Sequence, residues 1–84
     1  MIKIYGKEEC PFCVKAKKLC EDRGLEFTYY SIGEDLTVDE LKQMFPGAVT
    51  VPQIKVHDYS VGGYNELVNY IEETGYNGTG YSMS

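Results

Sequence analysis

The chain has 84 residues, of which 43% are hydrophobic and 25% charged, a composition typical of a folded globular protein. This length closes one modest core and leaves no surplus for a second, so we expect a single domain. The net charge of −5 argues against nucleic-acid binding, because neutralising phosphates requires clustered Lys and Arg.

The first third of the chain predicts a strand, a helix and a second strand. Residues 2–5 are rich in β-formers and predict the first strand. From residue 11, apolar side chains recur at three- and four-residue spacing until Gly24, which predicts a helix of about three turns. Residues 25–32 alternate and predict a second strand. One face of that strand carries Leu25, Phe27 and Tyr29. Elements joined this closely predict a parallel crossover unit.

A capping signal begins the second predicted helix. Thr37 and Glu40 have the spacing of a capping box, so a helix is expected over residues 38–45, ending before Pro46. The side chains expected to be buried are Val38, Leu41, Met44 and Phe45.

The remaining residues predict a hairpin and a last helix. Residues 53–56 and 59–61 read as antiparallel strands. Asn65 is the expected N-cap of a helix that closes near Gly75. The side chains expected to face inward are Leu67, Val68 and Ile71. The order of elements predicts an α/β fold with four strands and helices on both faces, in a domain of residues 1–75 followed by a flexible tail, 76–84.

Two cysteines stand where the first strand gives way to the first helix. Neither a charged segment followed by a long apolar one nor a run able to cross a bilayer is found, so we expect a cytoplasmic protein without membrane contact. In a reducing compartment, three cysteines do not make a disulfide scaffold. Cys10 and Cys13 instead form a C-x-x-C pattern, which indicates redox chemistry.

The spacing of this pair assigns the two thiols different tasks. With Cys10 as the N-cap and Pro11 as the first helical residue, Cys13 lies one turn along, within reach of a disulfide. The helix N-terminus favours a thiolate at Cys10, the expected nucleophile. Cys13, inside the first turn, is the expected resolving thiol.

A zinc site is the alternative interpretation of C-x-x-C, and we do not expect a metal. Zinc usually takes four ligands, and only Cys20 and His57 remain as further candidates. Cys20 lies about 10 Å along the same helix from Cys13 and is expected in the core. His57 lies in a predicted turn and is expected in solvent.

Three motifs resemble those of glutaredoxins, in particular small dithiol members of bacterial or phage type with a CPFC active site. They are KEECPFC from Lys7, TVPQ from Thr50 and VGGYNEL from Val61. The resemblance implies a thioredoxin-like fold, with a four-stranded mixed sheet flanked by three helices, and a cis proline, Pro52, facing the cysteines. It also implies thiol–disulfide oxidoreductase activity with glutathione as cosubstrate and no bound cofactor.

The same resemblance implies a set of glutathione-binding residues. They are Lys7, Phe12, Val51, Pro52, Gly63, Tyr64 and Asn65. Three positions depart from the usual pattern. Phe12 replaces a tyrosine, Asn65 replaces an aspartate, and Ala48 with Val49 stand where many relatives carry a basic residue.

The function implied is that of a monomeric electron donor to disulfide-containing proteins, among which ribonucleotide reductase is a frequent partner of such proteins. Cys10 attacks a disulfide, and Cys13 or glutathione resolves the intermediate. One alternative is a thioredoxin-like donor reduced by a flavoprotein reductase. Another is an iron–sulfur carrier, in which Cys10 of two chains and two glutathiones hold a cluster. Relatives of that second kind usually have one active-site cysteine or lack the proline found here at residue 11.

Overall fold

The computed structural model describes residues 1–47, 50–57 and 59–75. Its elements follow the predicted order, with slightly different ends: β1 (Ile2–Gly6), α1 (Pro11–Asp22), β2 (Phe27–Ser31), α2 (Val38–Met44), β3 (Gln53–Val56), β4 (Tyr59–Gly62) and α3 (Tyr64–Thr74). Ala48, Val49 and the predicted tail, 76–84, lie outside the described residues.

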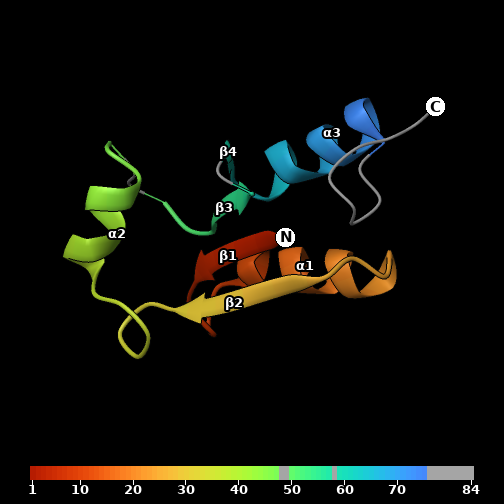
Figure 1. Ribbon diagram of the computed structural model, residues 1–84. Coiled ribbons are helices and arrows are strands. Elements are labelled where there is room, and N and C mark those ends of the chain that lie inside the picture. Colours follow the sequence, from red (N-terminus) through yellow and green to blue (C-terminus); the bar gives the residue numbers. More distant parts are fainter. Residues whose placement is uncertain (48–49, 58, 76–84) are drawn as a thin grey trace.

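The four strands form one mixed sheet in the order β2-β1-β3-β4 (Figure 1). β1 and β2 pair in parallel across the connection made by α1, as predicted. β3 runs antiparallel to β1 and to β4. In this register Ile4 of β1 lies between Tyr29 of β2 and Ile54 of β3, so the centre of the sheet is apolar. The fold is the thioredoxin-like α/β arrangement that was expected.

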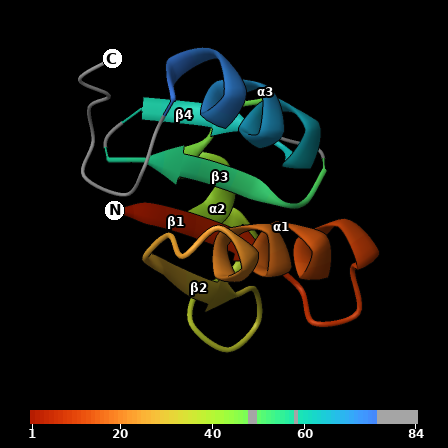
Figure 2. The same ribbon diagram turned by 90° about the vertical axis from the view of Figure 1, so that its right-hand side faces the viewer.

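The main core lies between the sheet and the pair α1 and α3, which cover the same face (Figure 2). Alternation along β1 directs Ile2 and Ile4 into this core and leaves Tyr5 on the opposite face. The buried members are Ile2, Ile4, Ala16, Cys20, Leu25, Ile54, Val56, Leu67 and Ile71. Phe27 and Tyr29 pack against them, as the alternation in β2 predicted.

A smaller cluster covers the other face, where α2 packs. Its buried residues are Tyr5, Leu41 and Phe45, and the Tyr5 ring stacks on Tyr30 with centroids 4.9 Å apart. Val38 and Met44 were expected to be buried, but they are 47% and 39% exposed. The prediction was wrong because α2 has only seven residues and turns a narrow stripe toward the sheet.

Helix ends follow local capping, with one correction. The Thr37 hydroxyl accepts from the Glu40 N–H at 3.1 Å, and the Glu40 carboxylate accepts from the Thr37 N–H at 2.9 Å, which confirms the capping box. At α3 the N-cap is Gly63 and not Asn65. The Glu66 carboxylate accepts from the Gly63 N–H at 2.8 Å and so begins the helix earlier.

Candidate active site

The two cysteines occupy the turn between β1 and α1. Cys10 is the N-cap of α1 with an extended backbone, and Pro11 is its first residue, as predicted. The Cys13 N–H donates to the Cys10 sulfur at 3.3 Å. The Cys10 sulfur thus accepts an N–H at the N-terminal end of α1, where the helix dipole is positive. All three cysteines of the chain are unpaired thiols.

Burial separates the roles of the two thiols. Cys10 is partly exposed, whereas Cys13 is completely buried. Burial, followed by the hydrogen bond with Cys10, raises the pKa of the Cys13 thiol to about 11. An incoming disulfide therefore reaches Cys10 first, while Cys13 is held as a protonated thiol behind it.

A tyrosine of β2 contacts the buried thiol, and sequence reasoning assigned it no role. The Tyr29 hydroxyl donates to the Lys7 carbonyl at 3.0 Å. The Lys7 backbone and, as a smaller effect, the Tyr29 hydroxyl lower the pKa of the Cys13 thiol against the stronger effect of burial. Burial and the nearby Cys13 raise the pKa of Tyr29 to about 12, so the phenol stays protonated. The alternation of β2 placed Tyr29 on the core face but could not show that its hydroxyl ends at a cysteine.

The loop before β3 faces the cysteine pair. The peptide bond between Val51 and Pro52 is cis, as the resemblance implied. The Cys10 thiol donates to the Val51 carbonyl at 3.7 Å, which brings the N-cap of α1 against a segment 41 residues away in the chain. Pro52 is buried, and Val51 is half-buried.

A cavity of about 150 Å³ lies beside Val51, at the start of α3. It is lined by Phe12, Thr50, Val51, Pro52, Gly63, Tyr64, Asn65 and Glu66. Six of the seven residues expected to bind glutathione therefore meet at one place; Lys7 is the exception. Thr50 and Glu66 are additional members, and both lie within the motifs that carried the resemblance. The N–H groups of the first turn of α3 have no acceptor within the helix, which suits this end of the cavity to an anionic group.

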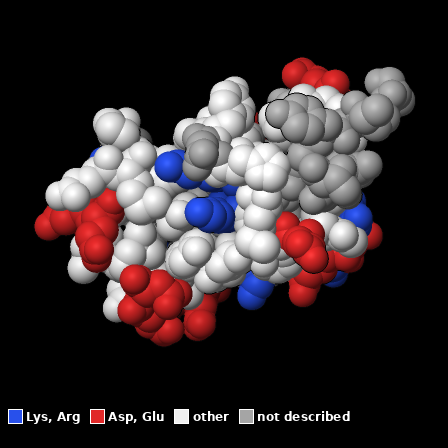
Figure 3. Space-filling model, viewed as in Figure 1, with Lys and Arg blue, Asp and Glu red and all other residues white. Residues whose placement is uncertain are grey.

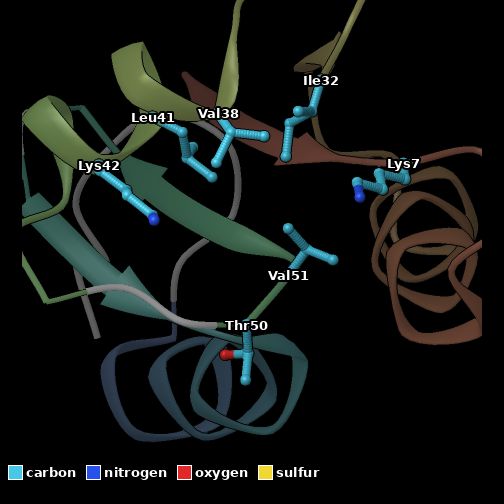
Figure 4. A pocket seen from close by; sticks show the side chains of 7 residues that line it. All are labelled: Lys7, Ile32, Val38, Leu41, Lys42, Thr50 and Val51. Atoms are coloured by element: carbon cyan, nitrogen blue, oxygen red, sulfur yellow. The ribbon is translucent and has the colours of Figure 1, made fainter.

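A second cavity, of about 380 Å³, adjoins the first, since Thr50 and Val51 line both. Its lining is Lys7, Ile32, Val38, Leu41, Lys42, Thr50 and Val51 (Figure 4). Lys7 thus lines the second cavity, the other expected binding residues line the first, and Val51 lines both. Sequence reasoning missed Ile32, Leu41 and Lys42, because nothing in the short motifs connects α2 to the cysteines.

Cys20 lies outside this site. Cys20 is completely buried in the main core, as expected, and burial raises the pKa of its thiol to about 11. Among residues 1–47, 50–57 and 59–75, no three His, Cys, Asp or Glu side chains are grouped as metal ligands. No helix within these ranges is long and apolar enough to span a membrane.

Charged side chains are unevenly placed on the face of the molecule shown in Figure 3. Acidic side chains gather in separate clusters, one of them over the β2–α2 loop (Figure 3). That loop contributes Glu34 and Asp35. The Asp35 carboxylate accepts from the Ser31 N–H at 2.8 Å, so part of this negative charge holds the loop to the end of β2.

Comparison with known sequences identifies the family. The glutaredoxin family model matches residues 2–61. Glutaredoxin 1 of Escherichia coli is 36% identical over 77 residues, covering 83% of this chain and 91% of that protein. The hybrid peroxiredoxin hyPrx5 of Haemophilus influenzae is 39% identical over 69 residues, covering 82% of this chain but only 28% of that longer protein.

Solved structures agree with this result. Reduced E. coli glutaredoxin superposes with a TM-score of 0.75 at 33% identity, covering 86% of this chain and 93% of that one. A buckwheat glutaredoxin–glutathione complex shares the fold, with a TM-score of 0.73 at 21% identity over 86% of this chain and 68% of that one. The chain belongs to the glutaredoxin family, with Cys10 and Cys13 as the redox pair of a glutaredoxin-type dithiol oxidoreductase.

Proposed function

We propose that the protein reduces glutathione mixed disulfides and protein disulfides, with Cys10 as nucleophile, Cys13 as resolving thiol and glutathione as reductant. The observation that carries this proposal is the asymmetry of the pair. The sulfur of the partly exposed Cys10 accepts a hydrogen bond from the Cys13 N–H and faces the Val51 carbonyl, while Cys13 is buried. The CPFC sequence fits a small dithiol glutaredoxin of bacterial or phage type.

The reaction is a pair of thiol–disulfide exchanges. The Cys10 thiolate attacks one sulfur of the target disulfide, and the other sulfur leaves as a thiolate that takes up a proton. Cys13 then loses its proton and attacks Cys10, which releases the second target thiol and leaves a Cys10–Cys13 disulfide. Two glutathione thiols reduce that disulfide and become glutathione disulfide. Two electrons pass from glutathione to the target, and cysteine carries each covalent step without a bound cofactor.

The smaller cavity is the proposed binding site for glutathione. A γ-glutamyl carboxylate would accept from the free N–H groups at the start of α3, beside Tyr64 and Asn65. The cysteinyl part would pair with the Val51 backbone next to the cis Pro52, with Gly63 allowing close approach and Phe12 forming one wall. The Phe12 and Tyr64 ring centroids lie 6.3 Å apart and frame this cavity. The glycyl end would then point toward Lys7. The buckwheat complex supports glutathione as the ligand, because that relative binds it on the same fold.

The proposed targets are proteins with accessible disulfides, of which ribonucleotide reductase is one. Residues 1–75 are the proposed active unit, and the cytoplasm is the proposed compartment. We propose that the protein acts as a monomer, because one chain carries both thiols and both cavities.

Steady-state reduction of a small glutathione mixed disulfide, with glutathione and glutathione reductase, tests the proposal. Cys10→Ser should abolish turnover. Cys13→Ser should still release glutathione from this substrate but should fail to reduce an intramolecular protein disulfide. Cys20→Ala is the matched control and should keep wild-type turnover. Equal losses in the Cys10 and Cys13 variants would contradict the assignment, and turnover with a flavoprotein thioredoxin reductase but not with glutathione would favour a thioredoxin-like donor.

A further inference from the structure

The larger cavity combines an apolar wall with two lysines. Ile32, Val38 and Leu41 turn their side chains into it from the end of β2 and from α2 (Figure 4). Lys7 and Lys42 extend from opposite sides, and their ammonium ends point toward the hollow (Figure 4). Val38 keeps 47% of its surface exposed here, although α2 has a core to pack against. An exposed apolar wall of this kind marks a contact surface when it forms part of a concave site.

The two ammonium groups favour an occupant with a negative charge. Within the described ranges, neither Lys7 nor Lys42 forms an ion pair, although the chain carries 13 acidic residues against 8 basic ones. In the nearby β2–α2 loop, the Asp35 carboxylate accepts from the Ser31 N–H and so holds that loop to the end of β2. A carboxylate entering the cavity would meet two ammonium groups beside apolar surface, where charge-assisted hydrogen bonds are stronger than in open water.

The position of the cavity ties it to the reacting sulfur. Val51 lines it, and the Val51 carbonyl accepts from the Cys10 thiol. A molecule that forms a disulfide with Cys10 beside Val51 therefore places its neighbouring residues at the mouth of this cavity. A glycyl carboxylate could reach Lys7, but glycine has no side chain to cover the exposed Val38. The volume of about 380 Å³ corresponds to on the order of ten water molecules, which is room for a larger side chain as well.

We infer that this cavity docks the segment that follows the reactive cysteine of a substrate protein, taking an apolar side chain directly after that cysteine and a carboxylate one residue later. The direction rests on the proposed function. Glutathione with its γ-glutamyl end at α3 points its C-terminal side toward Lys7, and a protein substrate bound in the same sense does likewise. The apolar side chain packs on Val38 and Leu41, and the carboxylate lies near Lys42.

The docked segment affects only the first thiol–disulfide exchange, the attack by Cys10. The Cys10 thiolate attacks the sulfur of the docked cysteine, an S–S bond forms between them, and the previous partner of that cysteine leaves as a thiolate. The seated segment orients the attacked sulfur and contributes no proton or electron. Lys42 is thus a specificity-determining residue and not a catalytic one.

Synthetic peptides activated with thionitrobenzoate provide the test. The chromogenic thiolate is the better leaving group, so Cys10 attacks the peptide sulfur, and absorbance reports this first step. Pre-reduced protein without glutathione is mixed with four peptides: Gly-Cys-Leu-Glu, Gly-Cys-Leu-Gln, Gly-Cys-Gly-Glu and the reversed Glu-Leu-Cys-Gly, all with blocked ends. Leaving glutathione out removes any effect of the variants on binding of the cosubstrate.

We expect the Leu-Glu peptide to react about fivefold faster than the Leu-Gln peptide, the ratio that one charge-assisted bond gives, and severalfold faster than the Gly-Glu and reversed peptides. Lys42→Gln should remove the preference for Glu, and Val38→Ser should remove the preference for Leu. Lys18→Gln on α1 is the matched control and should keep the preference for Glu and the preference for Leu. High salt should weaken the preference for Glu.

The outcomes separate this inference from the proposed function. Equal rates with all four peptides, or preferences unchanged in the Lys42 and Val38 variants, would overturn the docking site while leaving the Cys10 chemistry standing. A preference for the reversed peptide would overturn the direction and with it the inference. Reaction of Cys10→Ser protein at the wild-type rate would instead overturn the proposed function.

Discussion

Gly6 lies directly against Cys13, so close that a side chain at residue 6 would occupy the place of the buried sulfur. A Cβ atom there would lie 2.5 Å from the Cys13 Sγ and 2.9 Å from the Tyr29 hydroxyl. Gly6, which ends β1, therefore leaves room for the buried Cys13 sulfur.

Gly6→Ala should consequently lower stability and slow resolution. Overpacking a buried site typically costs about 1–3 kcal/mol, and here the atoms that must move are those of Cys13 and Tyr29. Urea unfolding under reducing conditions measures the loss. Gly63→Ala is the comparison variant: its nearest neighbour is the Glu66 carboxylate at 3.1 Å, so its cost is limited to the exposed cap hydrogen bond between that carboxylate and the Gly63 N–H, about 1 kcal/mol, and no core atom has to move. Equal stability of the two variants would contradict the role given to Gly6.

Tyr29→Phe should slow the second exchange while leaving the first unchanged. The hydroxyl lowers the pKa of Cys13, so its removal raises that pKa further above neutrality and reduces the thiolate fraction. One lost hydrogen bond of about 1 kcal/mol corresponds to roughly fivefold in rate.

The reaction with Ellman's reagent separates the two steps. The first thionitrobenzoate released reports attack by Cys10, and the second reports attack by Cys13 on the mixed disulfide. In wild-type protein the second phase should accelerate about tenfold per pH unit from pH 7 upward, because the Cys13 thiol is mostly protonated there. A slowed first phase in Tyr29→Phe would mean that the tyrosine acts on Cys10 as well.

The order of elements was readable from the sequence because each signal is local. The Thr37 box and the Cys10 N-cap need only residues within one turn, and both are confirmed. The sequence indicates Asn65 as the cap because N-cap propensity favours Asn over Gly. The structure prefers Gly63, since β4 ends at Gly62 and the Glu66 side chain reaches back to the Gly63 N–H.

The site was predictable to a similar extent. Residues of short motifs, such as Phe12 and Pro52, meet as expected at one cavity. Tyr29, which lies beside Cys13, and Lys42, which lines the cavity beside Val51, were missed because these placements depend on the order of strands in the sheet and on how α2 packs across it. No spacing along the chain encodes either placement.

The free energy of unfolding should fall in alkaline solution, because two buried thiols have raised pKa values. Burial raises the pKa values of Cys13 and Cys20 from 9.0 to about 11 each. A raised folded-state pKa means that the unfolded chain loses these protons first, so the stabilisation is complete below about pH 9 and is lost as pH rises to about 11. Urea unfolding at several pH values in a non-thiol reductant measures it. Cys20→Ala should show a smaller loss over this range, and a loss as steep as that of wild type would exclude Cys20 as a contributor.

Asn65→Asp should strengthen glutathione binding with little change in stability. Asn65 is the second residue of α3 and lines the smaller cavity, so a carboxylate there lies in the first turn, where negative charge is favourable by about 0.3–1 kcal/mol. A charge-assisted bond to the ammonium of the γ-glutamyl group is worth about 1 kcal/mol more than a neutral one, which lowers the Michaelis constant for glutathione about fivefold. Asn69→Asp, exposed and later in the same helix, adds the same charge away from the cavity and should leave that constant unchanged. If both variants lower it equally, long-range attraction and not contact at residue 65 is responsible. If neither does, recognition of the γ-glutamyl group rests on the backbone N–H groups of α3.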